Sequence, residues 1–279
     1  LQGEMGKEYA LLDGEKPEVA QAIFEQYMPR FAGDILPQQE IGRALSLADK
    51  LDNLAATFLR GLIPTGSQDP FALRRQTIGA VNILTDGKIH WDIRRGIEAA
   101  LALLPGEEET KKTVLSQIED FFRQRIKAIM LDEGIAYDII DAVLAGPVDD
   151  IYALFLKARS MAESQLKDEA DLRQAVTRLA NITKGKTGGK VDPSLFTEDV
   201  EKKLQDAFEA ASKKVLPLFA AYQYGEALPV LKGLTAPIND YLDNVMVMVD
   251  DEAVKNNRIS QLLATLALFN TWGDFSKLV

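Results

Sequence analysis

Apolar residues recur at intervals of three and four along almost the whole chain, and alternating strand patterns are scarce. This spacing gathers the apolar side chains on one face of a helix, so it predicts an all-α protein. Short breaks between successive helices favour antiparallel packing of neighbours. We expect helices over residues 17–31, 38–59, 70–84, 91–104, 110–132, 136–145, 148–164, 167–183, 197–222, 224–248 and 251–271.

The breaks between these helices are rich in glycine and proline. Segments 61–68 and 85–88 each end a helical pattern, and Asp69 followed by Pro70 predicts a cap at the start of the next helix. Segment 184–193 contains Gly185, Gly188 and Gly189. We expect this segment to be the most flexible part of the chain, with nothing in it that packs.

Composition removes several kinds of chemistry. The chain has no cysteine, which excludes disulfides, thiolate nucleophiles and Cys-based zinc sites and fits a reducing cytosol. His90 is the single histidine, so a metal site built mainly from imidazoles is excluded, as is a Ser-His-Asp triad unless His90 is its base. No apolar run is long enough to span a membrane. The first residues show neither an initiator Met nor a signal pattern, and we expect a longer polypeptide.

The net charge of −10 argues against a nucleic-acid partner, because phosphate contacts need lysine and arginine. A binding surface is local, however, and the two halves differ. Residues 1–160 carry 18 basic and 25 acidic side chains, whereas residues 161–279 carry 14 and 17. Lys184, Lys186 and Lys190 lie within seven residues that contain no acid. The second half is therefore the better place to look for contact with RNA.

Three stretches carry a family resemblance. They read LQGEMGKEYA at 1–10 with YMPRFAGD at 27–34, ALSLADKLD at 44–52 with GLIPTGSQDPFALRR at 61–75, and PINDYLDNVMVM at 237–248 with NNRI at 256–259 and DFSKL at 274–278. The first two are similar to the middle of the β subunit of bacterial glycyl-tRNA synthetase. The third resembles the anticodon-binding domain that this subunit shares with arginyl-tRNA synthetases. Residues 86–165 are covered only by continuity.

The resemblance implies a division into an HD-like helical domain over 1–85, a helical linker over 86–165 and an anticodon-binding bundle over 166–279. It implies that glycine activation with ATP and Mg, and glycyl transfer, occur on a separate α subunit, so that this chain has no catalytic residue and binds no cofactor. The implied partners are tRNA(Gly) and the α subunit, in a heterotetramer of two α and two β chains in the cytoplasm. Neither DNA nor a membrane is an expected partner.

The residues expected to contact tRNA follow from chemistry and from their place in the matching segments. Flexible ammonium groups can follow a phosphate backbone, while base edges need hydrogen-bonding side chains. The set comprises Arg178, Asn181, Lys184, Lys186, Lys190, Asn257 and Arg258, with Arg74 and Arg75 as further phosphate contacts. Phe219, Tyr222 and Tyr224 could stack on bases, although aromatic residues at helical spacing usually belong to a core.

Several of these residues also have a structural interpretation. The lysines could lie on a solvated loop, Asp69 could cap a helix beside ion-paired Arg74 and Arg75, and Arg258 could pair with Asp240 or Asp243.

Two other functions stay open at this stage. The segment Ala48-Asp49-Lys50-Leu51-Asp52 looks like the last conserved segment of HD-type phosphohydrolases, in which the residue matching Asp49 ligates a metal. Such an enzyme needs several imidazoles and carboxylates around the ion, and the chain has no His-Asp dipeptide. We therefore expect no metal here and treat Asp49 as a vestigial position. A purely architectural helical module that docks the α subunit is the other alternative.

Overall fold

The computed structural model describes residues 1, 3–66 and 68–278, and these residues form helices and no named strand. The prediction of an all-α protein is confirmed. The helices pack into two compact units, one of Leu1–Asp132 with Val148–Phe155 and one of Glu133–Pro147 with Leu156–Val279. These boundaries differ from those at residues 85 and 165, and the assignment of three functional domains stays a prediction.

The first unit is built around one long helix. Its elements are α1 (Glu4–Leu12), α2 (Pro17–Glu25), α3 (Glu40–Leu59), α4 (Leu73–Asp86), α5 (Ile93–Ala102), α6 (Glu108–Asp132) and the first residues of α8 (Ile151–Glu163). Helix α3 contacts α2, α4, α5 and α6. Its buried side chains Leu47, Leu51, Leu54 and Phe58 follow the spacing of three and four that predicted the helix. This central helix therefore supplies much of the core of the first unit.

A close crossing between α2 and α3 fixes the start of the first unit. Glu25 is buried and accepts hydrogen bonds from Gln21 Nε2 at 3.0 Å and from the backbone N of Gln39 at 3.1 Å. A Cβ at Gly42 would lie 1.9 Å from Glu25 Oε2, so only glycine fits there. A hydrogen bond of 2.8 Å between His90 Nδ1 and Asp150 Oδ2 ties segment 148–155 to the same unit.

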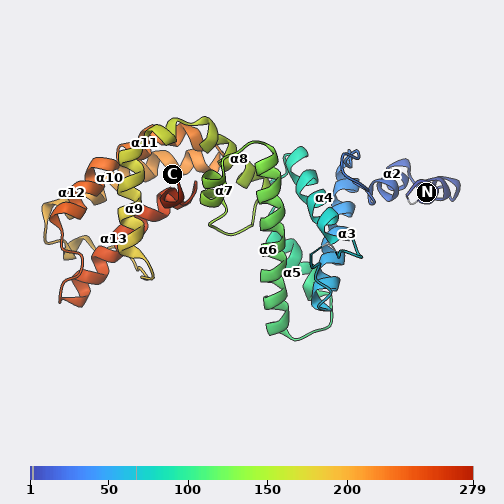
Figure 1. The fold of residues 1–279 in the computed structure, drawn as a ribbon, viewed down its shortest axis with the longest axis horizontal. Coiled ribbons are helices and arrows are strands. Elements are labelled where there is room, and N and C mark those ends of the chain that lie inside the picture. Colours follow the sequence, from blue (N-terminus) through green and yellow to red (C-terminus); the bar gives the residue numbers. More distant parts are fainter. Residues whose placement is uncertain (2, 67, 279) are drawn as a thin grey trace. The chain divides into compact units, whose positions relative to one another are not determined.

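The second unit consists mainly of the helices drawn from yellow to red in Figure 1. Its elements are α7 (Tyr137–Val143), the rest of α8, η1 (Gln165–Asp168), α9 (Ala170–Thr183), η2 (Pro193–Leu195), α10 (Asp199–Ala220), η3 (Tyr224–Ala227), α11 (Leu228–Lys232), α12 (Thr235–Asn244), α13 (Glu252–Asn270) and η4 (Phe275–Lys277). Helices α9 and α10 each contact both α12 and α13. The aromatic side chains of Tyr241, Phe269, Trp272 and Phe275 are fully buried and form much of this core.

Most expected helices are present, and the largest errors in extent concern two of them. The helix expected over 17–31 ends at Glu25, because Pro29 lacks a backbone N–H and disfavours a helical residue before it. The helix expected over 224–248 is three short elements, η3, α11 and α12; Pro229 lies in the first turn of α11, and Gly233 lies between α11 and α12. Helix α1 was not predicted. No helix formed by the described residues combines the length and the apolar composition needed to cross a bilayer.

Candidate nucleic-acid interface

The three lysines expected to meet RNA lie on the loop that follows α9 in the second unit. Lys184, Lys186 and Lys190 are all exposed, and Asn181 is exposed one turn before the first of them. Gly185 has a φ of +69°, a left-handed conformation that favours glycine and turns the chain away from the helix. The loop therefore carries its three ammonium groups into solvent. It leads into η2, and we call residues 184–192 the lysine loop.

The lysine loop is held against α13 by side-chain hydrogen bonds. The backbone N of Gly189 donates to Ser260 Oγ at 2.8 Å. The backbone N of Asp192 donates to Asn257 Oδ1 at 2.7 Å, and Asn257 Nδ2 donates back to Asp192 O at 3.0 Å. The expectation that nothing in this segment packs was wrong. Serine and asparagine on one face of α13 provide the partners that the loop backbone lacks in itself.

Asn257 is thus buried and holds the loop instead of facing outward. The Asp192 carboxylate accepts hydrogen bonds from the side chain and backbone N of Ser194 at 2.7 and 2.9 Å. These bonds, together with the charge of Lys190, lower the pKa of Asp192. The end of the loop therefore has a defined geometry, while the lysines stay accessible.

Arg258 has a structural position inside the second unit. Its Nε donates to Glu201 Oε1 at 3.0 Å, its Nη1 to Met246 O at 2.7 Å and its Nη2 to Thr197 Oγ1 at 2.7 Å. It is 5% exposed and Glu201 is fully buried. The partner is therefore Glu201, and the expected pairing with Asp240 or Asp243 was wrong.

Burial opposes the charge of both groups in this pair, but their mutual attraction is stronger. Burial alone would lower the pKa of Arg258, and the hydrogen bond and charge of Glu201 reverse this to a net rise. Burial likewise raises the pKa of Glu201, and the Arg258 hydrogen bond with two backbone N–H donors, from Thr197 and Glu198, lowers it overall. Both groups stay ionised, so Arg258 is engaged within the protein.

Arg178 links α9 to α12. Its Nη1 donates to Asn239 Oδ1 at 2.9 Å, and its Nη2 lies 2.5 Å from Asp243 Oδ1. The side chain is 38% exposed, so the guanidinium still reaches the surface. Of the aromatic residues, Phe219 and Tyr224 are buried, whereas Tyr222 is 37% exposed. In the second unit, the structure thus leaves Asn181 and the three lysines as the most accessible residues of the expected set.

In the first unit, the Asp49 carboxylate is surrounded by amides. Gln26 Nε2 donates to Asp49 Oδ1 at 3.1 Å, and Asn53 Nδ2 lies 3.4 Å from Oδ2. Asn53 Nδ2 also donates to Gln76 Oε1 at 3.1 Å. Within residues 1, 3–66 and 68–278 there is no group of three or more His, Cys, Asp or Glu side chains that could hold a metal ion. The residues around Asp49 therefore do not fit an HD-type metal centre.

Arg74 and Arg75 lie at the start of α4, after the loop that contains Pro64, Thr65 and Gly66. Ser67 of this loop lies outside the described residues. Asp69 accepts from the backbone N of Leu73 and Arg74 at 2.8 and 3.0 Å and so satisfies the first backbone N–H groups of α4. The expected placement of Asp69 directly before the helix, with Pro70 as its first residue, was wrong, because the helix begins at Leu73. Arg74 Nη2 donates to Gly66 O at 2.8 Å and so holds a carbonyl instead of a carboxylate. Arg75 is exposed.

Sequence reasoning missed two features beside these residues. Lys50 is 3% exposed, and its Nζ donates to Met28 O at 2.8 Å and to Ser46 Oγ at 2.7 Å. Nothing in the local pattern distinguishes it from a surface lysine. Glu201 was also missed, although its signal was present: Glu198 and Glu201 have capping-box spacing and form that motif at the start of α10.

Comparison with known proteins places these observations in a family. Residues 1–145 match the family model described as glycyl-tRNA synthetase beta subunit. A glycine--tRNA ligase beta subunit from Clostridioides difficile is 43% identical over 280 residues, which is 100% of this chain and 41% of that protein. The corresponding subunit of Desulforamulus reducens is 41% identical over 283 residues, again 100% of this chain and 41% of that protein. The chain thus spans 41% of the length of these relatives.

Proposed function

The chain belongs to the glycyl-tRNA synthetase beta subunit family, and from this we propose that it is a tRNA-binding part of glycine--tRNA ligase. In this proposal the chain holds tRNA(Gly), and the attachment of glycine with ATP and Mg takes place on a partner α subunit in the cytoplasm. The assembly contains two chains of each kind. Residues 1–85 form the HD-like domain, residues 86–165 the helical linker, and residues 166–279 the anticodon-binding bundle.

The anchored lysine loop is the observation that carries this proposal. Three exposed ammonium groups project from a segment whose backbone is fastened to α13 through Gly189 and Asp192. A fastened loop loses less conformational freedom on binding than a free one, so its phosphate contacts cost less entropy. Such contacts position the RNA without reading its sequence. The locally basic loop therefore supports tRNA contact in a chain of net charge −10.

The geometry around Asp49 favours this function over a metal-dependent phosphohydrolase. Gln26 and Asn53 offer amide N–H donors to the Asp49 carboxylate, where a metal centre would need further imidazole or carboxylate ligands. The purely architectural alternative is separated from the proposal by the RNA-binding test that follows.

The direct test replaces Lys184, Lys186 and Lys190 together by glutamate and measures binding of a tRNA(Gly) transcript by filter retention across a salt series. Affinity falls as salt rises, and each lost phosphate contact makes the negative slope of log K against log salt shallower by about 0.7 to 0.9. We expect binding to weaken at least about tenfold at low salt, with a slope smaller by about two.

A matched control is available on α10. Lys202, Lys213 and Lys214 are also exposed, and replacing these three by glutamate changes the net charge by the same amount. We expect this control to weaken binding much less. If both triple variants weaken tRNA binding equally, the loss is due to net charge and not to the lysine loop. An unchanged affinity of the lysine-loop variant for tRNA would contradict the proposal. The same variants in the complete β subunit, assembled with its α subunit, report whether charging of tRNA(Gly) falls in parallel.

A further inference from the structure

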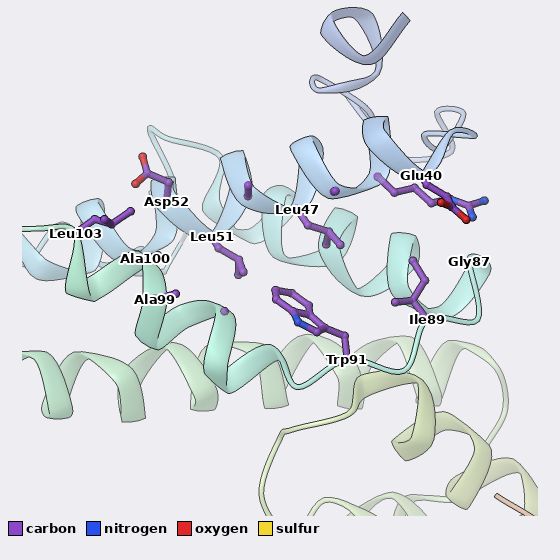
Figure 2. A pocket seen from close by; sticks show the side chains of 14 residues that line it. Glu40, Leu47, Leu51, Asp52, Gly87, Ile89, Trp91, Ala99, Ala100 and Leu103 are labelled. Carbon is purple, nitrogen blue, oxygen red and sulfur yellow. The ribbon is translucent and has the colours of Figure 1, made fainter. Parts of the chain in front are cut away.

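An apolar groove with a volume of about 740 Å³ lies between α3 and α5 in the first unit, and it has no part in the function proposed above. Figure 2 shows Leu47 and Leu51 pointing from α3 toward the indole of Trp91, with Ala99 and Ala100 on the facing helix. Leu103, at the end of α5, is 84% exposed. An apolar cleft of this kind with an exposed leucine at its rim is typical of a protein-binding surface.

Small residues keep the groove open. Ala44 and Ala48 on α3 and Ala99 on α5 line the groove with small side chains. The Trp91 ring packs directly on Gly96, where a Cβ would lie 2.3 Å from it, so the indole forms part of the groove wall. The small alanine side chains let an incoming element approach the backbone of α3 closely. The groove follows α3 from Glu40 to Asp52, a rise of about 18 Å at about 1.5 Å per residue. That length fits about three turns of a helix.

Acidic groups occupy both ends of the groove. Figure 2 shows Glu40 at one end of it and Asp52 at the other. Both are exposed, and across the described parts of the chain neither carboxylate has an ion-pair or hydrogen-bond partner. The one lining base, Arg43, already donates to Pro37 O at 2.9 Å and lies 3.9 Å from Asp86 Oδ2. The groove is therefore apolar in the middle and negative at its ends.

We propose that this groove binds an amphipathic helix of a partner polypeptide, with an apolar stripe flanked by lysine or arginine residues about three turns apart. The stripe would cover Leu47, Leu51 and Trp91, and the flanking cations would meet Glu40 and Asp52. Charge also argues against a second copy of this chain as the occupant. Two copies pairing through the same groove would bring their acidic ends together. The proposal uses residues apart from the lysine loop and does not rest on the tRNA-binding function.

The probe is a fluorescein-labelled helical peptide of about 18 residues, with leucines at helical spacing and lysines at two positions 11 residues apart. A second peptide differs only by glutamate at those two positions. Fluorescence anisotropy with the whole chain should show the lysine peptide binding at least about tenfold more tightly than the glutamate peptide. The double variant Glu40→Lys, Asp52→Lys should reverse that preference. Equal affinity of the two peptides for the unchanged protein would overturn the proposal.

Leu103→Asp tests the groove itself without threatening the fold, because the Leu103 side chain is already in solvent. We expect it to weaken the lysine peptide at least about tenfold. Leu12→Asp is the matched control, since Leu12 is 80% exposed on α1. Equal loss in both variants would overturn the proposal. Concentration-dependent dimerisation that Leu103→Asp abolishes would also overturn it, because the occupant would be a second copy of the chain. Displacement of the peptide by stoichiometric decanoate would overturn it as well, because the groove would then bind a fatty acid. We expect Leu103→Asp to bind tRNA as the unchanged chain does, so that loss of peptide binding and loss of tRNA binding are told apart.

Discussion

The two units bury positive charge in different ways. In the first unit, the Lys50 ammonium is surrounded by neutral oxygens, from Met28 and Ser46, and burial lowers its pKa to about 8 against a small opposing effect of Asp49. In the second unit, Arg258 faces the Glu201 carboxylate, and its pKa is raised despite burial. Whether a full negative charge meets the buried base therefore decides the direction in which its pKa shifts. The first arrangement can titrate, whereas the second is permanently ionised and joins α10 to α13.

The chain carries one tryptophan in each unit, which allows the two to be followed separately. Trp91 lies in the first unit and Trp272 in the second. A Trp272→Phe background leaves a fluorescence signal from the first unit, and a Trp91→Phe background leaves one from the second. Within one background, the fluorescence change reports the unfolding of one unit. Any loss of stability from the background substitution is present in both proteins that are compared, so it cancels in their difference.

The largest effect is expected from breaking the buried ion pair. Arg258→Met leaves Glu201 charged and without its guanidinium partner, and removing one partner of a buried pair costs about 3–5 kcal/mol. Urea unfolding followed by Trp272 fluorescence measures this loss. Adding Glu201→Gln removes the stranded charge while keeping an acceptor for the backbone N of Thr197 and Glu198, so the double variant should regain part of the stability. A double variant no more stable than the single one would show that charge is not the main cost.

A second prediction uses the pH dependence of Lys50. Its pKa is lowered from 10.5 to about 8 on folding, so between these values the unfolded state binds more protons than the folded state. The free energy of unfolding must therefore rise with pH in that window, by up to about 3 kcal/mol at 1.36 kcal/mol per unit.

Lys50→Met removes this contribution. The difference between wild type and Lys50→Met, measured by urea unfolding through Trp91 fluorescence at pH 7.5 and pH 10, should shift in favour of the wild type as pH rises. Other groups titrate in both proteins and cancel in the difference. A constant difference across this range would mean that Lys50 keeps an ordinary affinity for its proton.

The smallest stability effect is expected at the anchor of the lysine loop. Asn257→Ala removes the reciprocal hydrogen bonds with Asp192, at a cost of about 1–2 kcal/mol. Its clearer consequence is local: trypsin should cleave at Lys184, Lys186 or Lys190 several times faster once the loop is released. Asn256→Ala is the control, because Asn256 precedes Asn257 in the sequence and its side chain is exposed. Identical cleavage rates in the two variants would show that Asn257 does not hold the loop.

The sequence predicted much of the helical framework from local information. Helices α3, α6 and α13 lie within two residues of their expected ranges. Helices α3 and α6 each have an apolar stripe, whereas α13 is buried on most of its surface. Predictions failed where the outcome depended on short-range breakers within an otherwise helical pattern. Pro29 ended α2 early, and Pro229 and Gly233 interrupted the helix expected after residue 224. The capping role of Asp69 followed from its chemistry, whereas the first residue of α4 did not.

The sequence by itself determined that the chain is all-α, that it lacks cysteine chemistry, that it resembles a synthetase subunit, and that Lys184, Lys186 and Lys190 form a local basic run. Only the tertiary structure decided that Asn257 anchors the lysine loop, and that Arg258 and Lys50 are buried with very different partners. Helical periodicity and composition are properties of neighbouring residues and can be read along the chain. The partner of a polar side chain lies up to 65 positions away in these bonds, so it is fixed only when helices pack.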